Sequence, residues 1–278
     1  MVSSILSLLA AKISFSGGGA GRRKKKDIYM KKVITFFNEK GGTGKTTLTA
    51  LFSSYLAYKL REPVFVMDMD YPSYQMYQIR QTDIDILKNE PAAPLARFYD
   101  GSPLFSVGRT AGQDSFTPAQ LETIAKALAR QLDGEGYFLI DFPGRFLPND
   151  PIYHLVRKGM IDLVVFPIDT DRQSCASALN TYATMRGLSK GRQKTAFLWN
   201  KEAVTERRTG KIEALTQQLR DNGLTVIDGN IRDIVIARRD ARTFGFIRNS
   251  VCWPQANVNK ACGYIEGIFD QIKALADK

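Results

Sequence analysis

The sequence predicts an α/β fold, in which a mostly parallel, doubly wound sheet is flanked by helices. Two observations predict this fold. Short, continuously apolar runs alternate with helical segments along the chain, and such runs are typical of parallel strands buried on both faces. The chain has 278 residues, of which 44% are hydrophobic and 24% are charged, so it is long enough for a sizeable core and has globular composition.

The elements can be placed from their periodicity and their start signals. The expected strands cover residues 33–37, 64–67, 137–140, 163–166, 195–199 and 224–227, and the expected helices cover residues 46–60, 117–132, 172–187, 209–221 and 257–276. The second of these helices has a clear N-terminal signal, because Thr117 is followed by Pro118 and then by Gln120. Residues 91–116 are rich in Pro, Gly and Ser without a clear period, which predicts a long loop or an insertion.

The first 29 residues differ from the rest of the chain. They contain six basic residues and one acidic residue, and so contribute much of the net charge of +11. Their apolar run is too short to span a bilayer, and its basic residues follow it rather than precede it as in a secretory signal. We expect residues 1–29 to be a disordered or dispensable leader, with a weak membrane or nucleic-acid contact as the alternative. Residues 30–278 are expected to form a single domain.

Cysteine and histidine content limits the chemistry. The three cysteines, Cys175, Cys252 and Cys262, form no CxxC pair, and His154 is the only histidine. This pattern argues against a disulfide scaffold, a zinc ribbon and a thioredoxin-type motif, and excludes a His-rich metal site. Free thiols fit a reducing compartment, so we expect a cytoplasmic protein.

The strongest functional signal is the segment Asn38–Thr47, which reads NEKGGTGKTT. It follows an expected strand and begins an expected helix, which is the context that a phosphate-binding loop requires. Its glycines allow successive backbone N–H groups to face an anion, and the helix N-terminus adds partial positive charge. Lys45 can reach the β- and γ-phosphates, and the Thr46 hydroxyl can ligate Mg²⁺. The predicted nucleotide-binding residues are Gly41, Gly42, Thr43, Gly44, Lys45, Thr46 and Thr47.

This loop departs from the general Walker A pattern in two ways. Glu39 stands where the first glycine would be, and an additional lysine, Lys40, precedes the paired glycines. The motif resembles the deviant Walker A of the ParA/MinD family of dimerising ATPases. The resemblance implies a P-loop NTPase fold, ATP and Mg²⁺ as ligands, and a homodimer. It also implies that Lys40 crosses the dimer interface to the partner's nucleotide, in the manner of an arginine finger.

Carboxylates follow two of the expected strands. Asp68 and Asp70 lie two residues apart at a strand end and are expected to point toward the ligand edge of the sheet. The family has Asp-x-Asp-Pro here, which implies that Asp70 orients the attacking water and that Asp68 supports the metal. This chain inserts Tyr71 before Pro72. The ordinary alternative is that both aspartates cap the next turn.

The strand at 137–140 ends in Asp141-Phe142-Pro143-Gly144, an apolar run followed by Asp that is typical of a Walker B motif. By resemblance, Asp141 would hold Mg²⁺ and Pro143-Gly144 would sense the γ-phosphate, although the family more often has proline in place of Gly144. Asn200, after the strand at 195–199, resembles the asparagine with which the family recognises adenine. The alternative for Asn200 is a turn-forming role. The resemblance therefore implies Lys40, Lys45 and Asp70 as catalytic residues.

Two basic clusters lie in the second half of the chain. One, within residues 181–194, contains Arg186, Lys190, Arg192 and Lys194, and the other, within residues 231–250, contains Arg239 and Arg242. Family members bind DNA non-specifically through basic residues, and contacts to phosphate require charge but no reading of bases. The resemblance thus implies non-specific DNA binding, with Arg239 and Arg242 as the expected contacts. Solvated helix faces are the ordinary alternative.

These observations predict a ParA-like ATPase that dimerises on ATP and binds DNA. A partner protein would stimulate hydrolysis, so that the cycle drives plasmid or chromosome partition or positions a DNA-linked cargo. A MinD-like ATPase acting on a membrane or a protein without DNA is the alternative. Membrane binding would need an amphipathic anchor, and helix 257–276 has an apolar stripe. A helix packed on the sheet shows the same stripe, so stable membrane binding is not expected.

Two other enzyme classes on this fold fit the sequence less well. A small-molecule kinase would not need Lys40. An iron–sulfur ATPase would need two cysteines in the region where Cys175 stands alone.

Overall fold

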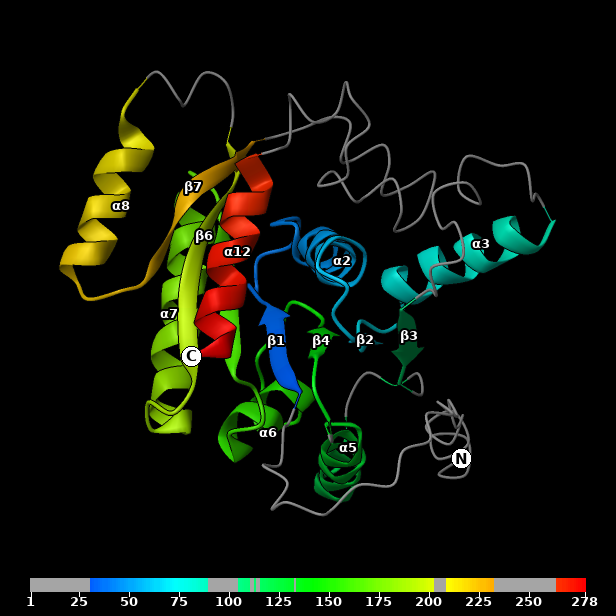
Figure 1. Cartoon of the computed structure of the whole chain (residues 1–278). Helices are drawn as coiled ribbons and strands as arrows, with labels where there is room; N and C mark the ends of the chain where they lie inside the picture. The colour runs from blue at the N-terminus through cyan, green and yellow to red at the C-terminus, as the bar shows by residue number, and fades with distance from the viewer. Residues whose placement is uncertain are drawn as a thin grey trace, which may run out of the picture.

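The computed structural model describes residues 31–89, 105–110, 113, 116–132, 134–202, 209–232 and 264–278. Its strands form one seven-stranded sheet in the order β3-β2-β4-β1-β5-β6-β7 (Figure 1), and every neighbouring pair is parallel. The strands are β1 (Lys32–Phe36), β2 (Val64–Asp68), β3 (Ser106–Arg109), β4 (Tyr137–Asp141), β5 (Leu163–Ile168), β6 (Lys194–Glu202) and β7 (Val226–Arg232). The predicted α/β fold with a parallel sheet is confirmed.

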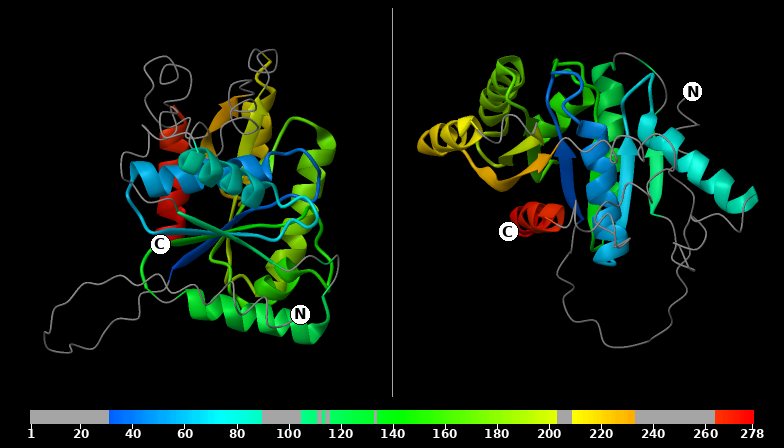
Figure 2. Two further views of the ribbon diagram at one scale, coloured as in Figure 1. Left: turned by 90° about the vertical axis from the view of Figure 1, so that its right-hand side faces the viewer. Right: turned by 90° about the horizontal axis from the view of Figure 1, so that it is seen from above.

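Helices cover both faces of this sheet, as the view from above in Figure 2 shows. One face packs against α2 (Lys45–Ser54), its π-helical continuation η1 (Tyr55–Lys59), α3 (Gln75–Asn89) and α12 (Tyr264–Asp277). The other face packs against α5 (Pro118–Gln131), α6 (Pro151–Lys158), α7 (Arg172–Ser189) and α8 (Lys211–Asp221). The sheet is therefore doubly wound, and its inner strands β1, β4 and β5 are buried on both sides.

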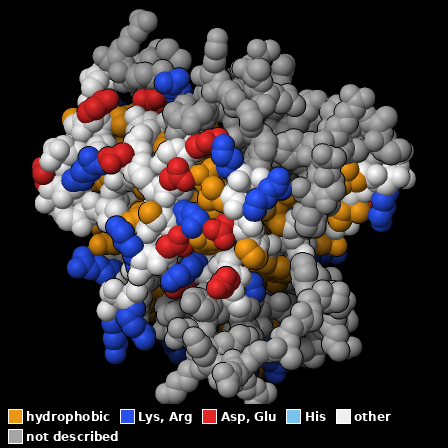
Figure 3. Space-filling model, in the orientation of Figure 1, with side chains coloured by type: hydrophobic (Ala, Val, Ile, Leu, Met, Phe, Trp, Pro, Cys, Tyr) orange, Lys and Arg blue, Asp and Glu red, His pale blue; other side chains and the backbone are white. Residues whose placement is uncertain are grey.

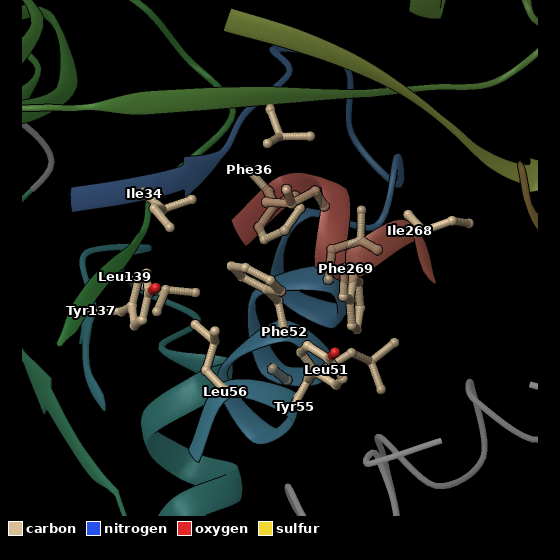
Figure 4. Packing of buried hydrophobic residues seen from close by; sticks show 14 of the residues in the cluster. Ile34, Phe36, Leu51, Phe52, Tyr55, Leu56, Tyr137, Leu139, Ile268 and Phe269 are labelled. Carbon is tan, nitrogen blue, oxygen red and sulfur yellow. The ribbon is translucent and has the colours of Figure 1, made fainter. Parts of the chain in front are cut away.

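The first core is built around aromatic rings from β1, α2 and α12 (Figure 4). Phe52 makes edge-to-face contacts with Phe36 and Phe269, with ring centroids 5.8 and 5.2 Å apart. The apolar stripe of α12 supplies this core, since Ile265, Ile268, Phe269 and Ile272 are all buried and Leu275 packs against them. The stripe that a membrane anchor would need is therefore used in packing. Within the described residues, no helix is both long enough and apolar enough to cross a bilayer.

Most expected elements agree with the structure where it describes them. The last expected strand, 224–227, is observed at Val226–Arg232, and residues 257–263 of the last expected helix lie outside the described part. Three further elements differ from the expectation. Strand β3 lies inside the segment 91–116 that was expected to be a loop, and residues 90–104 lie outside the described part. The sequence of β3 is Ser-Val-Gly-Arg, which has a single apolar residue and so little strand signal. Helices α3 and α6 were not predicted, although α6 begins with Asp150-Pro151, a start signal of the same kind as Thr117-Pro118. The predicted capping box at Thr117 and Gln120 is confirmed.

The sheet topology places the predicted site residues along one edge. In a parallel sheet all strands end at the same edge, and here β1, β4 and β2 are neighbours. The phosphate loop, residues 38–47, follows β1. Asp68 ends β2 directly beside Asp141, which ends β4.

Candidate nucleotide-binding site

The backbone of the phosphate loop takes conformations that require glycine. Gly42 and Gly44 have φ angles of 74° and 93°, in the left-handed region that side chains disfavour. Gly44 is the N-cap of α2, and within the described residues no side chain caps this helix or places an acidic group in its first turn. The first N–H groups of α2 are therefore available to an anion, which the partial positive charge of the helix end also favours.

Two residues of β6 support this loop from beneath. The Asn200 Nδ2 donates to the carbonyl oxygen of Thr43 at 2.7 Å, and the Lys201 Nζ donates to the carbonyl oxygen of Gly42. A Cβ at Gly44 would lie 2.5 Å from Asn200 Nδ2, so only glycine fits there. Lys201 has a φ of 60°, a strained conformation for a lysine. Asn200 thus contacts the phosphate loop itself, and its contact with adenine stays a prediction.

Asn38 anchors the start of the phosphate loop to β5 and α7. Its buried Nδ2 donates to the carbonyl oxygens of Pro167 at 2.9 Å and Ser174 at 3.2 Å, and its Oδ1 accepts from the Lys40 N–H at 3.0 Å. Sequence reasoning assigned no role to Asn38 or to Lys201. The only sequence signal for Asn38 is a polar residue directly after an apolar strand.

The two lysines of the loop lie in different surroundings. The Lys45 Nζ donates to the carbonyl oxygen of Lys40 at 3.3 Å, and burial lowers the pKa of Lys45 while Asp141 and Asp70 oppose this change. Lys40 instead forms an ion pair with Asp171, the N-cap of α7, and this hydrogen bond is the main cause of the raised pKa of Lys40. The predicted intermolecular lysine is therefore held within its own chain in this structure.

The two strand-end aspartates are buried side by side but differ in their hydrogen bonds. Asp68 accepts from the backbone N–H groups of Asp70 at 3.0 Å and Tyr77 at 3.1 Å. Neither oxygen of Asp141 has a hydrogen bond of normal geometry among the described residues, although the Thr46 hydroxyl lies close enough to favour the charged carboxylate. Burial is the main cause that raises the pKa of Asp68 to about 6. Burial and then the neighbouring Asp68 raise the pKa of Asp141 well above its usual range, and the nearby Thr46 hydroxyl opposes this rise.

Asp70 lies in the turn after β2, where it is less buried than Asp68. Its Oδ2 accepts from the Ser73 hydroxyl at 2.7 Å, and its carbonyl oxygen accepts from the Tyr74 N–H at 2.8 Å. The structure thus brings together the predicted residues of the phosphate loop, Asp68, Asp70, Asp141 and Asn200 at one edge of the sheet. Arg239 and Arg242 lie outside the described residues.

Residues 34–272 match the family model of the CobQ/CobB/MinD/ParA nucleotide binding domain. The chain belongs to this family. The match spans the phosphate loop, all three aspartates and most of α12, so membership rests on most of the chain and not on one motif. It confirms a nucleotide-binding P-loop fold of the ParA/MinD type.

Solved structures of this family share the fold at low sequence identity. The MinD cell division protein of Aquifex aeolicus is 18% identical with a TM-score of 0.57, and the match covers 87% of this chain and 97% of that one. A protein described as a plasmid partition protein of Borrelia burgdorferi, bound to AMPPNP, is 16% identical with a TM-score of 0.56, covering 87% and 99%. The pNOB8 ParA is 16% identical with a TM-score of 0.55, covering 89% and 97%. No curated protein sequence is significantly similar to this chain.

The residues of this family site also fit Mg²⁺. Magnesium usually takes one or two carboxylates together with substrate phosphates and waters, rather than an all-protein cage. A buried carboxylate without a partner at Asp141, beside the hydroxyl of Thr46, is suited to this purpose. Within the described residues, no group of three His, Cys, Asp or Glu side chains gathers to hold a metal by itself.

The cysteines give no sign of a second metal or redox centre in the described part of the chain. Cys175 is a free thiol in the first turn of α7, and burial raises its pKa to about 11. A thiol with such a pKa is a poor nucleophile and a poor metal ligand at neutral pH. Cys252 and Cys262 lie outside the described residues.

Proposed function

We propose that this protein is a cytoplasmic ParA-like ATPase that binds ATP with Mg²⁺, dimerises on ATP and hydrolyses it when a partner protein stimulates it. One observation carries the proposal. The uncapped N-terminus of α2, the lysine Lys45 and the unpartnered carboxylate of Asp141 converge on the edge of the sheet where the phosphate loop lies. These are the groups that a nucleoside triphosphate and its magnesium ion need.

Each residue has a distinct role in this proposal. The N–H groups of residues 41–47 bind the phosphates, and Lys45 neutralises the β- and γ-phosphates. Thr46 and Asp141 would hold Mg²⁺, which supplies charge neutralisation between the phosphates when bound. Asp68 holds the turn that carries Asp70, because its carboxylate binds the N–H of Asp70. Asp70 orients the attacking water.

Lys40 is proposed to act across the dimer. To reach the partner's nucleotide it must leave Asp171, with which it pairs in the structure. Both side chains of this pair are partly exposed, and exposed ion pairs are weak, so the change is inexpensive. We expect Lys40→Ala to abolish ATP-dependent dimerisation, measured by light scattering, while ATP binding stays measurable. Unchanged dimerisation would remove this role from Lys40.

The proposed nucleic-acid partner is DNA, bound without sequence specificity. Arg239 and Arg242 are the proposed contacts to its phosphates. On the face shown in Figure 3, basic and acidic side chains are interspersed over the middle of the molecule, whereas several basic side chains at the lower left have no acidic neighbour among the described residues. Binding of the protein to random-sequence duplex DNA should depend on ATP rather than ADP and should weaken with salt. Because ATP favours the dimer in this proposal, and a dimer doubles the number of contacts to DNA phosphates, ATP would control the affinity for DNA.

The alternative is a MinD-like positioning ATPase that acts on a protein partner. The MinD fold likeness supports it, while the burial of the α12 stripe disfavours a membrane anchor in that helix. Absence of DNA binding in both nucleotide states would favour this alternative.

A further inference from the structure

Glu39 occupies the position at which the general Walker A pattern has its first glycine. The backbone of Glu39 is part of the phosphate loop, but its carboxylate reaches two other elements. Oε1 accepts from the Phe146 N–H at 3.2 Å, and Oε2 accepts from the Thr181 hydroxyl of α7 at 2.7 Å. One side chain therefore joins the phosphate loop, α7 and the β4 loop, which we define as residues 141–150.

The β4 loop lies directly against the phosphate loop. A Cβ at Gly144 would be 2.9 Å from the carbonyl oxygen of Glu39 and 3.0 Å from the Lys45 Nζ. Gly144 is thus next to the lysine that is expected to meet the β- and γ-phosphates.

Two carboxylates hold this loop at consecutive backbone positions. Glu39 binds the N–H of Phe146, and the buried Asp150 binds the N–H of Leu147 at 2.8 Å. Asp150 belongs to the β4 loop itself, so it shapes the loop without attaching it to another element. Glu39, by contrast, attaches the β4 loop to the phosphate loop and to α7 through side-chain hydrogen bonds.

We propose that Glu39 is a positioning residue that holds the β4 loop ready for the γ-phosphate, and so favours a nucleoside triphosphate over a diphosphate. This inference rests on the proposed function. A loop that is already ordered loses less conformational freedom when it closes on its ligand. A diphosphate has no third phosphate to touch this loop, so its affinity should not depend on Glu39.

Simple electrostatics predicts the opposite change in nucleotide affinity when Glu39 is replaced. Glu39 is an exposed negative charge beside an anion-binding loop, and like charges repel. Removing that charge should tighten binding of both nucleotides, and of the triphosphate most. The direction of the change in affinity therefore distinguishes positioning from charge repulsion.

The test compares the affinities of AMPPNP and ADP, each with Mg²⁺, by titration calorimetry of the full chain. Glu39→Ala removes the bonds to both Phe146 and Thr181. We expect it to weaken AMPPNP binding about fivefold, a factor within the range of net hydrogen-bond contributions, and to leave ADP binding nearly unchanged. Glu39→Gln removes the charge but keeps an acceptor for Phe146 and can still bond Thr181, so it should bind both nucleotides like the unaltered chain. Thr181→Val removes the bond between Glu39 and α7, together with the bond from the Thr181 hydroxyl to the Ser177 carbonyl within α7, and should weaken AMPPNP binding by less than Glu39→Ala does.

Several results would overturn this inference. Equal weakening of AMPPNP and ADP in Glu39→Ala would indicate a general structural role, and tighter binding in Glu39→Ala and Glu39→Gln would indicate charge repulsion alone. If Glu39→Ala does not fold, Thr181→Val decides, and an unchanged ratio of AMPPNP to ADP affinity there overturns the inference. An unaltered chain that binds neither nucleotide would instead overturn the proposed function.

Discussion

Two loops border the phosphate loop at the same edge of the sheet, and each begins with a buried aspartate. The β4 loop starts at Asp141, and the loop that we call the β2 loop, residues 68–74, starts at Asp68. Both aspartates are at most 1% exposed. Asp68 accepts two backbone hydrogen bonds, whereas Asp141 has no hydrogen bond of normal geometry among the described residues. Burial alone would class the two carboxylates together, but their hydrogen bonds separate them.

The difference assigns a separate task to each aspartate. A buried carboxylate that binds backbone N–H groups stabilises its own turn, which is how Asp68 holds the loop that carries Asp70. A buried carboxylate without partners costs free energy in the ligand-free protein. Such a cost is expected where a cation completes the site, and Asp141 is therefore the stronger candidate for Mg²⁺.

Replacing each aspartate by asparagine should give the largest effects, with opposite signs for stability. Asp141→Asn should weaken Mg²⁺-dependent ATP binding about hundredfold, because it removes the charged metal ligand. In EDTA the same variant should be more stable by about 1–2 kcal/mol, since no unpaired carboxylate is buried. Asp68→Asn should be less stable by a similar amount, because its amide N–H group would face a backbone donor.

Thermal unfolding in EDTA and calorimetry with Mg·ATP measure these two quantities on the same samples. The comparison fails if both variants lose stability equally, since Asp141 would then be as much a structural group as Asp68. It also fails if Asp68→Asn loses metal-dependent binding as completely as Asp141→Asn.

Much of this edge could be predicted because its signals are local in the sequence. The glycines of the phosphate loop, the strand ends at Asp68 and Asp141, and the capping box at Thr117 each depend on a few consecutive residues. The apolar runs then imply a parallel sheet, which brings strand ends together without any knowledge of individual contacts.

The remaining features depend on contacts between residues far apart in the chain. Asn38 bonds to Ser174, Glu39 to Thr181, and Lys201 to Gly42, and neither partner in any of these pairs signals the other in the sequence. Strand β3 was missed because it is a short edge strand that is held by β2 rather than by its own apolar residues. The close approach of Gly144 to the backbone of Glu39 is another contact between segments far apart in the chain.

A second prediction concerns this packing of the β4 loop. Gly144→Ala would place a Cβ 2.9 Å from the backbone oxygen of Glu39, so one of the two loops must move. We expect AMPPNP binding to weaken about tenfold, because overpacking against a backbone is costly. The matched control is Gly187→Ala in α7, where a Cβ meets nothing within 4 Å and should raise stability by about 0.5–1 kcal/mol. Equal behaviour of the two variants in nucleotide titrations would contradict the close contact.

The smallest effect is expected from weakening the attachment of the β2 loop, and it concerns the rate of ATP hydrolysis. Stacked side chains attach this loop to strand β3. The Arg109 guanidinium lies 4.7 Å from the ring centroid of Tyr77 and 5.3 Å from that of Tyr74. Tyr74 has a φ of 38°, and its N–H binds the carbonyl oxygen of Asp70. The Tyr74 hydroxyl also donates to the carbonyl oxygen of Thr110 at 3.0 Å, so the loop with the inserted Tyr71 is held from the edge of the sheet.

Arg109→Ala removes the contacts with both Tyr74 and Tyr77. It should therefore slow ATP hydrolysis about threefold, which lies within the range expected for exposed cation–π interactions, and should leave ATP affinity unchanged. The rate falls because Asp70 is held less firmly, whereas the phosphate loop and Asp141 are untouched. Arg109→Lys keeps the charge but loses the planar stacking. Its rate of ATP hydrolysis should therefore lie between that of the unaltered chain and that of Arg109→Ala. Steady-state phosphate release gives the rate, and calorimetry gives the affinity. A loss of affinity without a change in rate would show that the β2 loop serves binding, as the β4 loop does, and the proposed division between the two loops would then be wrong.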